Sequence, residues 1–426
     1  MRVPMIVLFA LLPLQWFGLG STPLGTGRLH QVALVGFAAV VLSCYRLRAH
    51  APVLRTAALF VVMSLYWLLA WAAVDLYNGR LPRGSVQELI YLAVFVALST
   101  CFFRGASAEE PRLATALRWV APVACASVVI GFSVAMLVNG VNPAAVLGRT
   151  IASADPELFQ KEVFKTSFAG FGLDEEMVKG NLRHEIFGSL LLSMMISTWA
   201  MRFGPSVTTR AQHVAYRMAM ITGVVLLTLS LSRSVLIAAL VWPALALSRS
   251  VRRGGLTSGQ VAGLAGTIVA AAGLAFSGVG LVIWNRFTTD TTGYDARAEN
   301  YFAAFEALPD HWLTGGFETG GVSSHNFVVD SMLRGGIFTA LPALAMLVIV
   351  VALFVRLVIS LPQQPEWLVP VAAALALPLV RMGTSGGGLI PPIEWVALAF
   401  AMGIVTHVRT QVAGRETAPV LTEARR

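Results

Sequence analysis

The chain has 426 residues, of which 56% are hydrophobic and only 12% are charged, and its mean hydropathy is +0.73. About a quarter of the residues of a soluble domain are charged, so this composition excludes a soluble domain and predicts an integral membrane protein. The net charge of +9 does not indicate nucleic-acid binding, because the arginines fall on every second predicted loop, as the positive-inside rule requires.

Twelve membrane-spanning helices are predicted, because apolar runs of about the 20 residues that cross a bilayer recur along the sequence. In chain order they are residues 3–20, 30–46, 56–75, 86–103, 119–138, 185–202, 217–231, 234–248, 260–283, 337–359, 366–382 and 391–408. The first run is interpreted as a span and not as a cleaved signal peptide, because it is followed by a poor cleavage site. Residues 1–426 are therefore expected to form one transmembrane domain, an all-α polytopic membrane protein.

Arginine clusters set the predicted topology. The clusters are Arg46, Arg48 and Arg55; Arg104, Arg112 and Arg118; Arg202, Arg210 and Arg217; Arg249, Arg252 and Arg253; and Arg409, Arg415, Arg425 and Arg426. They predict that both termini are cytoplasmic and that two long loops, residues 139–184 and 284–336, lie on the outer side. These two loops also carry most of the carboxylates of the chain.

Residues 218–247 form an apolar stretch that is interrupted only by a short polar segment around Arg233. One helix of this length would measure about 45 Å, which exceeds a hydrocarbon core of about 30 Å. Both flanks are basic and therefore cytoplasmic, which requires an even number of passes. We expect a hairpin of two short helices, with Arg233 below the outer membrane surface, where its charge has to face a polar cavity.

In the second outer loop, residues 295–308 have the apolar period of an amphipathic helix. Its apolar side consists of Tyr301, Phe302, Phe305 and Leu308. Pro309 is expected to end this helix. A helix of this kind is expected to lie on or near the outer membrane surface.

A histidine motif follows this predicted helix. Residues 308–325 read Leu-Pro-Asp-His-Trp-Leu-Thr-Gly-Gly-Phe-Glu-Thr-Gly-Gly-Val-Ser-Ser-His, then comes Asn326, and nine residues later a segment begins at Gly336. The pattern resembles the O-antigen ligase and O-antigen polymerase superfamily of bacterial envelope glycosyltransferases. In that superfamily a Pro-x-x-x-x-Gly-x-Gly loop leads to His-Asn and then to Gly-x-x-Gly. Thr339 stands where the last of these glycines is expected.

Two arginines match further elements of this resemblance, which covers mainly residues 183–339. Leu-Ser-Arg-Ser-Val-Leu-Ile around Arg233 is similar to a Ser-Arg-x-x-x-Leu element, with Ile237 in place of the leucine. Arg183 precedes a predicted span and resembles the arginine that these families place before a cavity-facing helix. A guanidinium stays charged and binds a diphosphate through two hydrogen bonds, and a helix N-terminus attracts the same anion.

Ordinary structural roles are the alternatives for these residues. His325 would then be a loop histidine bonded to carbonyls, Arg233 a partner in an interhelical salt bridge, and Arg183 a charged span end. Asn326 either orients the His325 ring or caps the following helix.

Other cations that are predicted on or near the outer side suggest an anionic ligand at the outer leaflet. They are Arg80, Arg83, Arg286, Arg297 and Arg381. The outer loops contain no Asp-x-Asp and no cluster with metal-ligand spacing. We therefore expect neither a metal nor another cofactor.

The resemblance implies transfer of an O-antigen glycan from a polyprenyl diphosphate to a sugar hydroxyl of lipid A-core, at the outer leaflet of the bacterial inner membrane. His325 would act as general base, and Arg183 and Arg233 would stabilise the departing diphosphate. A direct displacement of this kind inverts the anomeric configuration. The expected partners are the donor, the acceptor and membrane lipids.

Two other functions stay open. A polymerase of the same superfamily would use another polyprenyl-linked glycan as acceptor, and the sequence separates it poorly from a ligase. A secondary transporter or flippase is the third possibility, because charge within the membrane also marks transport pathways.

Overall fold

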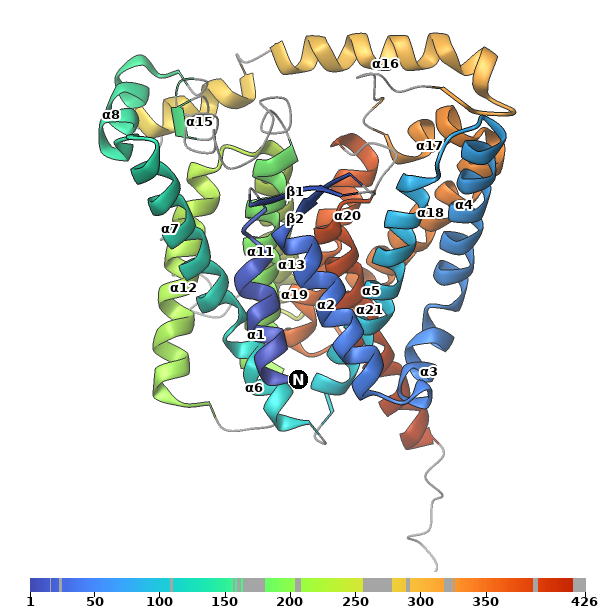
Figure 1. The fold of residues 1–426 in the computed structure, drawn as a ribbon. Helices are drawn as coiled ribbons and strands as arrows, with labels where there is room; N and C mark the ends of the chain where they lie inside the picture. The colour runs from blue at the N-terminus through green and yellow to red at the C-terminus, as the bar shows by residue number, and fades with distance from the viewer. Residues whose placement is uncertain are drawn as a thin grey trace, which may run out of the picture.

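Most apolar runs of the sequence form helices of membrane-spanning length in the computed structural model (Figure 1). The structure describes residues 1–15, 17–22, 25–107, 110–155, 158, 162–163, 181–203, 208–255, 278–288, 292–317, 324, 326–385 and 390–416. Within these residues, nine helices are long and apolar enough to cross a membrane, and a tenth span results if two helices bent by 115° are counted as one. The chain is therefore a helical, multi-pass membrane protein.

The elements of the first part of the chain are mainly helices. They are α1 (Arg2–Leu11), β1 (Gly18–Thr22), β2 (Gly25–Arg28), α2 (Leu29–Cys44), α3 (Leu47–Thr56), α4 (Ala58–Tyr77), α5 (Arg83–Gly105), α6 (Pro111–Arg118), α7 (Val120–Val138) and α8 (Pro143–Ser153). The two strands form an antiparallel hairpin between α1 and α2. The sequence analysis did not predict this hairpin.

In the second part of the chain, every described secondary-structure element is a helix or a helical turn. Its elements are α11 (Asn181–Phe203), α12 (Arg210–Leu229), α13 (Arg233–Arg252), α15 (Gly278–Thr288), α16 (Thr292–His311), α17 (Phe327–Gly335), α18 (Ile337–Ser360), η2 (Glu366–Leu368), α19 (Val369–Ala374), α20 (Ala376–Val380), η3 (Arg381–Ser385) and α21 (Pro392–Glu416). The helical hairpin predicted around Arg233 is confirmed, because α12 ends at Leu229 and α13 begins at Arg233. Its two helices are not short, however, since each has 20 residues.

Three predicted spans have a different form in the structure. The run 3–20 contains only the ten-residue α1 before the strands begin, and most of the run 260–283 lies outside the described residues. The run 366–382 is broken into η2, α19 and α20 and ends in η3, a π-helical turn. Pro370 and Pro378 lie in this broken stretch, and a proline removes a backbone donor and strains the preceding turn.

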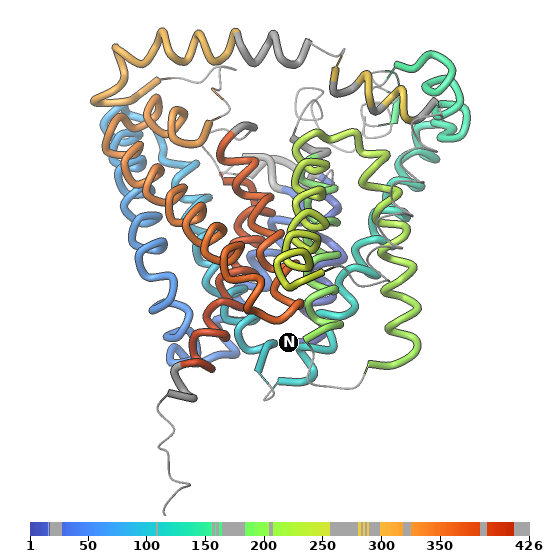
Figure 2. The backbone as a smooth tube through the Cα atoms, turned by 180° about the vertical axis from the view of Figure 1, so that it is seen from behind, coloured from blue at the N-terminus to red at the C-terminus, as the bar shows by residue number. Residues whose placement is uncertain are grey.

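The predicted amphipathic helix corresponds to α16, which crosses one end of the bundle in both views (Figures 1 and 2). Phe302 is 70% exposed, whereas Ala304 is fully buried, as a helix with one side available to lipid requires. The expected end at Pro309 was wrong, because α16 continues to His311. A proline in the last turn of a helix removes only one hydrogen bond, so two more residues remain helical.

The centre of the bundle is formed by α5, α11 and α21. In α11 and α21, 83% of the spanning window is buried, against 22% in α12 and α18 at the periphery. Gly403 of α21 lies directly against the Ser99 carbonyl of α5, and Phe102 packs edge-on against Phe400. Met1 and the C-terminal end of α21 both lie at the end of the bundle opposite α16 (Figures 1 and 2). The central helices carry the buried charges described next.

Candidate functional site

Three helix N-termini meet in a buried chain of hydrogen bonds. His184, near the start of α11, bonds through Nδ1 to Ser234 Oγ of α13 at 2.7 Å and through Nε2 to Glu394 Oε1 of α21 at 2.6 Å. His184 is 2% exposed and Glu394 is fully buried. The second oxygen of Glu394 has no hydrogen-bond partner among the described residues. The positive ends of three helix dipoles therefore surround a buried acid.

A second acid lies beside this chain. Arg28, from the β hairpin, donates from Nη1 to Glu185 Oε2 at 3.2 Å, and the charge of Arg381 in η3 acts on the same carboxylate. Gln15 donates from Nε2 to the Glu185 backbone oxygen at 3.3 Å. Because Glu185 follows His184 directly, the hairpin and η3 both contribute to this network. An ion pair at this depth stays in place only if its other polar groups are also bonded.

The turn between α12 and α13 holds Arg233 at the same end of the bundle. Leu231 has a φ of 49° and is buried, a left-handed conformation that costs a non-glycine residue about 1–2 kcal/mol. The Ser232 amide donates to Ser230 Oγ at 3.2 Å and fixes the turn. Arg233 is thereby the first residue of α13, half-buried and adjacent to Ser234. Strain of this kind persists only where the surrounding structure enforces it.

Asn326 caps α17. Its Oδ1 accepts hydrogen bonds from the backbone amides of Val328 and Val329 at 3.0 and 3.2 Å. Its Nδ2 donates to the carbonyl of Gly383 in η3 at 3.3 Å. Of the two predicted roles, capping is therefore observed, and the same amide connects the start of α17 to the turn that carries Arg381.

His325 itself lies outside the described residues, but its chain neighbours are fixed. Asp330, which is fully buried in α17, accepts from the Ser324 amide at 2.7 Å and from Ser324 Oγ at 2.6 Å. Asn326 is held by its cap. The residues on both sides of the predicted base are therefore bonded to α17.

The glycine-rich loop before the motif packs against the end of α17. The amide of Gly316 donates to the Arg334 carbonyl at 2.8 Å, and Arg80 Nη2 donates to the Gly316 carbonyl at 3.2 Å. Gly315 and Gly336 have φ values of 66° and 64°, and a side chain on either residue would collide with the backbone of the other segment. Glycine is therefore required at both positions.

Thr339, which replaces the expected glycine, bonds within α17 and α18. Its Oγ1 donates to the carbonyls of Ser331 and Gly336. Its side chain lies directly on Gly335, where an added side chain would collide with it. The departure from the superfamily pattern is therefore accommodated by a glycine at the neighbouring position.

Arg334 is a half-buried cation that was not among the predicted site residues. Its guanidinium lies 5.5 Å from the centre of the Trp71 ring, a cation–π contact. Burial lowers the pKa of Arg334, and the charges of Asp330, Asp75 and Glu88 oppose that shift. Glu88 in turn accepts from the Ile390 amide and from Trp395, at 3.1 and 2.8 Å. Charged groups of three helices, α4, α5 and α17, therefore lie close together at the α16 end of the bundle.

The structure brings some predicted site residues together and separates others. Arg183 is the third residue of α11 and Arg233 is the first of α13, and the residues that follow them, His184 and Ser234, are bonded to each other. Arg83 is exposed at the start of α5. For Arg183, Arg286 and Arg297 only the backbone is described.

α15, which carries Arg286, packs against α8, across the bundle from α4 and α17 (Figure 1). Its backbone therefore lies apart from the residues around Asn326. α16, which carries Arg297, packs against α17.

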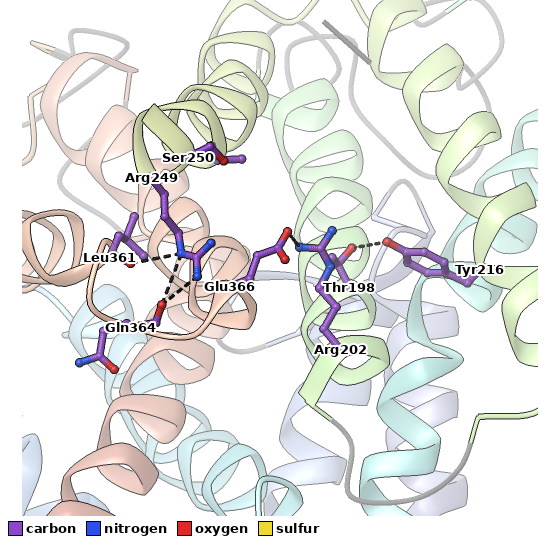
Figure 3. Close-up of polar contacts among 9 residues, drawn as sticks. Thr198, Arg202, Tyr216, Arg249, Ser250, Leu361, Gln364 and Glu366 are labelled. Atoms are coloured by element: carbon purple, nitrogen blue, oxygen red, sulfur yellow. Dashed lines mark hydrogen bonds and ion pairs between the residues drawn. The ribbon is translucent and has the colours of Figure 1, made fainter. Parts of the chain in front are cut away.

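Arginines at the opposite end of the bundle have different partners (Figure 3). Arg249 donates to the carbonyls of Leu361 and Gln364 at 3.0–3.4 Å. Arg202 forms a 2.5 Å ion pair with Glu366, in which both side chains are about half exposed. These arginines fasten the connection between α18 and η2.

Within the described residues, no group of three or more His, Cys, Asp or Glu side chains is arranged to hold a metal ion. No protein-family model matches the chain, and no curated protein sequence is significantly similar to it. Function is therefore inferred from the motifs and from this geometry.

Proposed function

We propose that the protein is a glycosyltransferase of the bacterial inner membrane that moves an O-antigen glycan from a polyprenyl diphosphate to a sugar hydroxyl of lipid A-core. One observation carries the proposal beyond the motif resemblance. The helix starts that bear Arg183 and Arg233 are adjacent, as the His184–Ser234 bond requires, and Asn326 reaches the turn that bears Arg381. Three arginines and the neighbour of His325 thus belong to one connected region.

In the proposed reaction, His325 removes the proton of the acceptor hydroxyl, a role that general bases fill with about 10²–10⁴-fold rate enhancement. Arg183 and Arg233 stabilise the charge that develops on the diphosphate, with support from two helix N-termini. The donor and acceptor are held by cations at the α16 end of the bundle, Arg80, Arg83, Arg297 and Arg381. Asn326 positions the turn that carries Arg381. Arg286 is not included, because α15 packs against α8, apart from this region. Direct displacement inverts the anomeric carbon and uses no metal.

The proposal includes the finer topology. Twelve spans, cytoplasmic termini and a periplasmic active site would put the α16 end of the bundle at the outer leaflet, where lipid-linked glycans and lipid A-core meet. The basic residues of the opposite end, including Arg249 and Arg253, would then face the cytoplasm. Cysteine-accessibility labelling of single residues at each end tests this orientation.

The transfer reaction tests the proposal directly. Purified protein in lipid nanodiscs is given a polyprenyl diphosphate-linked glycan together with lipid A-core. We expect wild type and Arg253→Ala, an opposite-end control, to transfer glycan, and His325→Ala and Arg233→Ala to lose transfer. Normal transfer by His325→Ala would refute the base assignment. Growth of the lipid-linked glycan instead of lipid A-core would identify a polymerase.

A second candidate is a proton-coupled transporter or flippase. The buried His184–Glu394 pair favours it, because ionisable pairs inside a membrane bundle also form proton pathways. Glycan-lipid flux that depends on a proton gradient in proteoliposomes, without glycosidic bond cleavage, would select this function.

A further inference from the structure

Ser234, His184 and Glu394 have the connectivity of a proton relay. The imidazole is bonded at both nitrogens, to Ser234 Oγ at 2.7 Å and to Glu394 Oε1 at 2.6 Å. An imidazole in this position accepts a proton at one nitrogen while it releases one from the other. The chain therefore moves a proton between its two ends without changing the charge of His184.

Glu394 is the buried end of the chain. It is fully buried, and its Oε2 has no hydrogen-bond partner among the described residues. In one arrangement of the protons the acid donates to His184 Nε2, Nδ1–H donates to Ser234 Oγ, and the serine hydroxyl is left to donate elsewhere. Ser234 Oγ also lies 3.4 Å from Ser232 Oγ.

The other end of the chain is the accessible one. Ser234 is half-buried, whereas His184 and Glu394 are almost completely buried. Ser234 is the second residue of α13, directly after Arg233. The accessible end of the chain therefore lies at the N-terminus of α13, next to Arg233 in the sequence.

Other charged groups face this chain from the surrounding elements. Glu185 of α11 interacts with His184, Glu394 and two arginines, Arg28 of β2 and Arg381 of η3. Glu88 of α5 acts electrostatically on the same region and interacts with Glu394. Two further acids, Glu185 and Glu88, and two arginines, Arg28 and Arg381, therefore surround the chain.

We infer that Ser234, supplied by His184 and Glu394, donates a proton to the departing diphosphate. This inference rests on the proposed function. The bond between the anomeric carbon and the phosphate oxygen breaks, and its electron pair stays on that oxygen, which takes the hydroxyl proton of Ser234. His184 Nδ1–H then reprotonates Ser234, and Glu394 reprotonates Nε2. One proton leaves the acceptor hydroxyl for His325, and one passes from Glu394 to the diphosphate. After the products leave, His325 gives its proton to solvent, and water at the half-buried Ser234 end returns one proton along the same chain to Glu394.

The test measures glycan transfer in nanodiscs by wild type, Ser234→Ala and Glu394→Gln, across pH and in mixtures of H₂O and D₂O. Loss of the relay should lower kcat by about 10²-fold and leave the KM for the donor unchanged. In wild type, a plot of kcat against the deuterium fraction should be curved, because several protons move together. In both variants the same plot should be linear. Ser193→Ala, which removes a buried α11 hydroxyl bonded to the Ser189 carbonyl, should behave as wild type.

Each outcome separates the two proposals. If wild type transfers glycan and the variants match its rate and its deuterium dependence, the relay is refuted and the proposed function stands. If wild type transfers no glycan, the proposed function itself fails. Should Glu394→Gln not fold, Ser234→Ala decides the question, because its hydroxyl lies at the half-buried end of the chain.

Discussion

At the end of the bundle opposite α16, the buried Arg249 is bonded to backbone carbonyls, whereas at the α16 end the buried His184 is bonded to a carboxylate. Arg249 is only 8% exposed, yet its donors are taken by the carbonyls of a connecting loop. Arg28 and His184 instead face the carboxylates of Glu185 and Glu394. Burial of a charge therefore does not mark a functional site by itself, and we use the type of partner to separate the two ends.

The two kinds of partner have different consequences. An arginine that fastens a loop through carbonyls cannot release them without loosening the fold. Side chains that bond to other side chains can exchange a partner for a ligand phosphate or pass on a proton. We therefore expect substitution of Arg249 to lower stability alone, and substitution of charged side chains at the α16 end to lower catalysis.

The largest expected effect compares Arg233 with Arg249. Arg233→Ala should lower kcat for glycan transfer by about 10²–10³-fold, as loss of one donor to developing charge does. Arg249→Ala removes three hydrogen bonds to carbonyls and should lower the free energy of unfolding by about 2–3 kcal/mol. Its transfer rate per folded molecule should stay near wild type. Equal losses of transfer in the two variants would show that the two arginines do not differ in role.

Next in size is the glycine contact that holds the loop before the histidine motif. Gly336→Ala should destabilise the protein by about 3 kcal/mol, because a collision with the Leu313 backbone adds to the strain of a positive φ. Gly140 has the same φ of 64° but open space around it, so Gly140→Ala should cost about 1 kcal/mol. Unfolding titrations of the two variants measure the difference, and equal values would argue against the contact.

A smaller effect is expected at two asparagine caps. Asn326 caps α17 and Asn142 caps α8 through the same pair of amide bonds, so substitution of either by alanine should lower stability by about 1 kcal/mol. Only Asn326→Ala should also slow glycan transfer, because only this amide connects its helix to Gly383. Glycan transfer is measured with equal amounts of folded protein for each variant. A similar loss of transfer in Asn142→Ala would contradict the prediction.

The smallest effect is expected at the exposed ion pair. Arg202 and Glu366 are 48% and 55% exposed, so Glu366→Gln should change stability by less than about 1 kcal/mol. The change should shrink further in high salt. A thermal unfolding series at two ionic strengths provides the measurement, and a large effect independent of salt would mean that this pair is structural.

Much of the fold was predictable from local patterns. The basic flanks of residues 218–247 predicted the hairpin that α12 and α13 form, and aromatic spacing predicted α16. Both features depend on residues close together in sequence. The β hairpin was missed because its strands, Gly-Leu-Gly-Ser-Thr and Gly-Thr-Gly-Arg, lack the alternation that indicates a strand.

The candidate site was predictable only in part. Arg233 and Asn326 were found from motifs, but the bond between His184 and Glu394 joins residues 210 positions apart, and no spacing rule predicts such a pair. A signal did exist, since Glu394 lies within an apolar run where an acid is rarely tolerated without a role. His184 and Glu185 stand next to Arg183 and share that signal.

The configuration of the transferred sugar tests the central claim most directly. Reconstituted protein is incubated with a polyprenyl diphosphate-linked glycan of known anomeric configuration and with lipid A-core, and the new linkage is determined by NMR. The account predicts a glycan joined to lipid A-core with the configuration inverted, since His325 and the arginines act in one direct displacement. The account would be contradicted if the sugar retains its configuration, or if the donor stays intact after incubation with correctly folded protein.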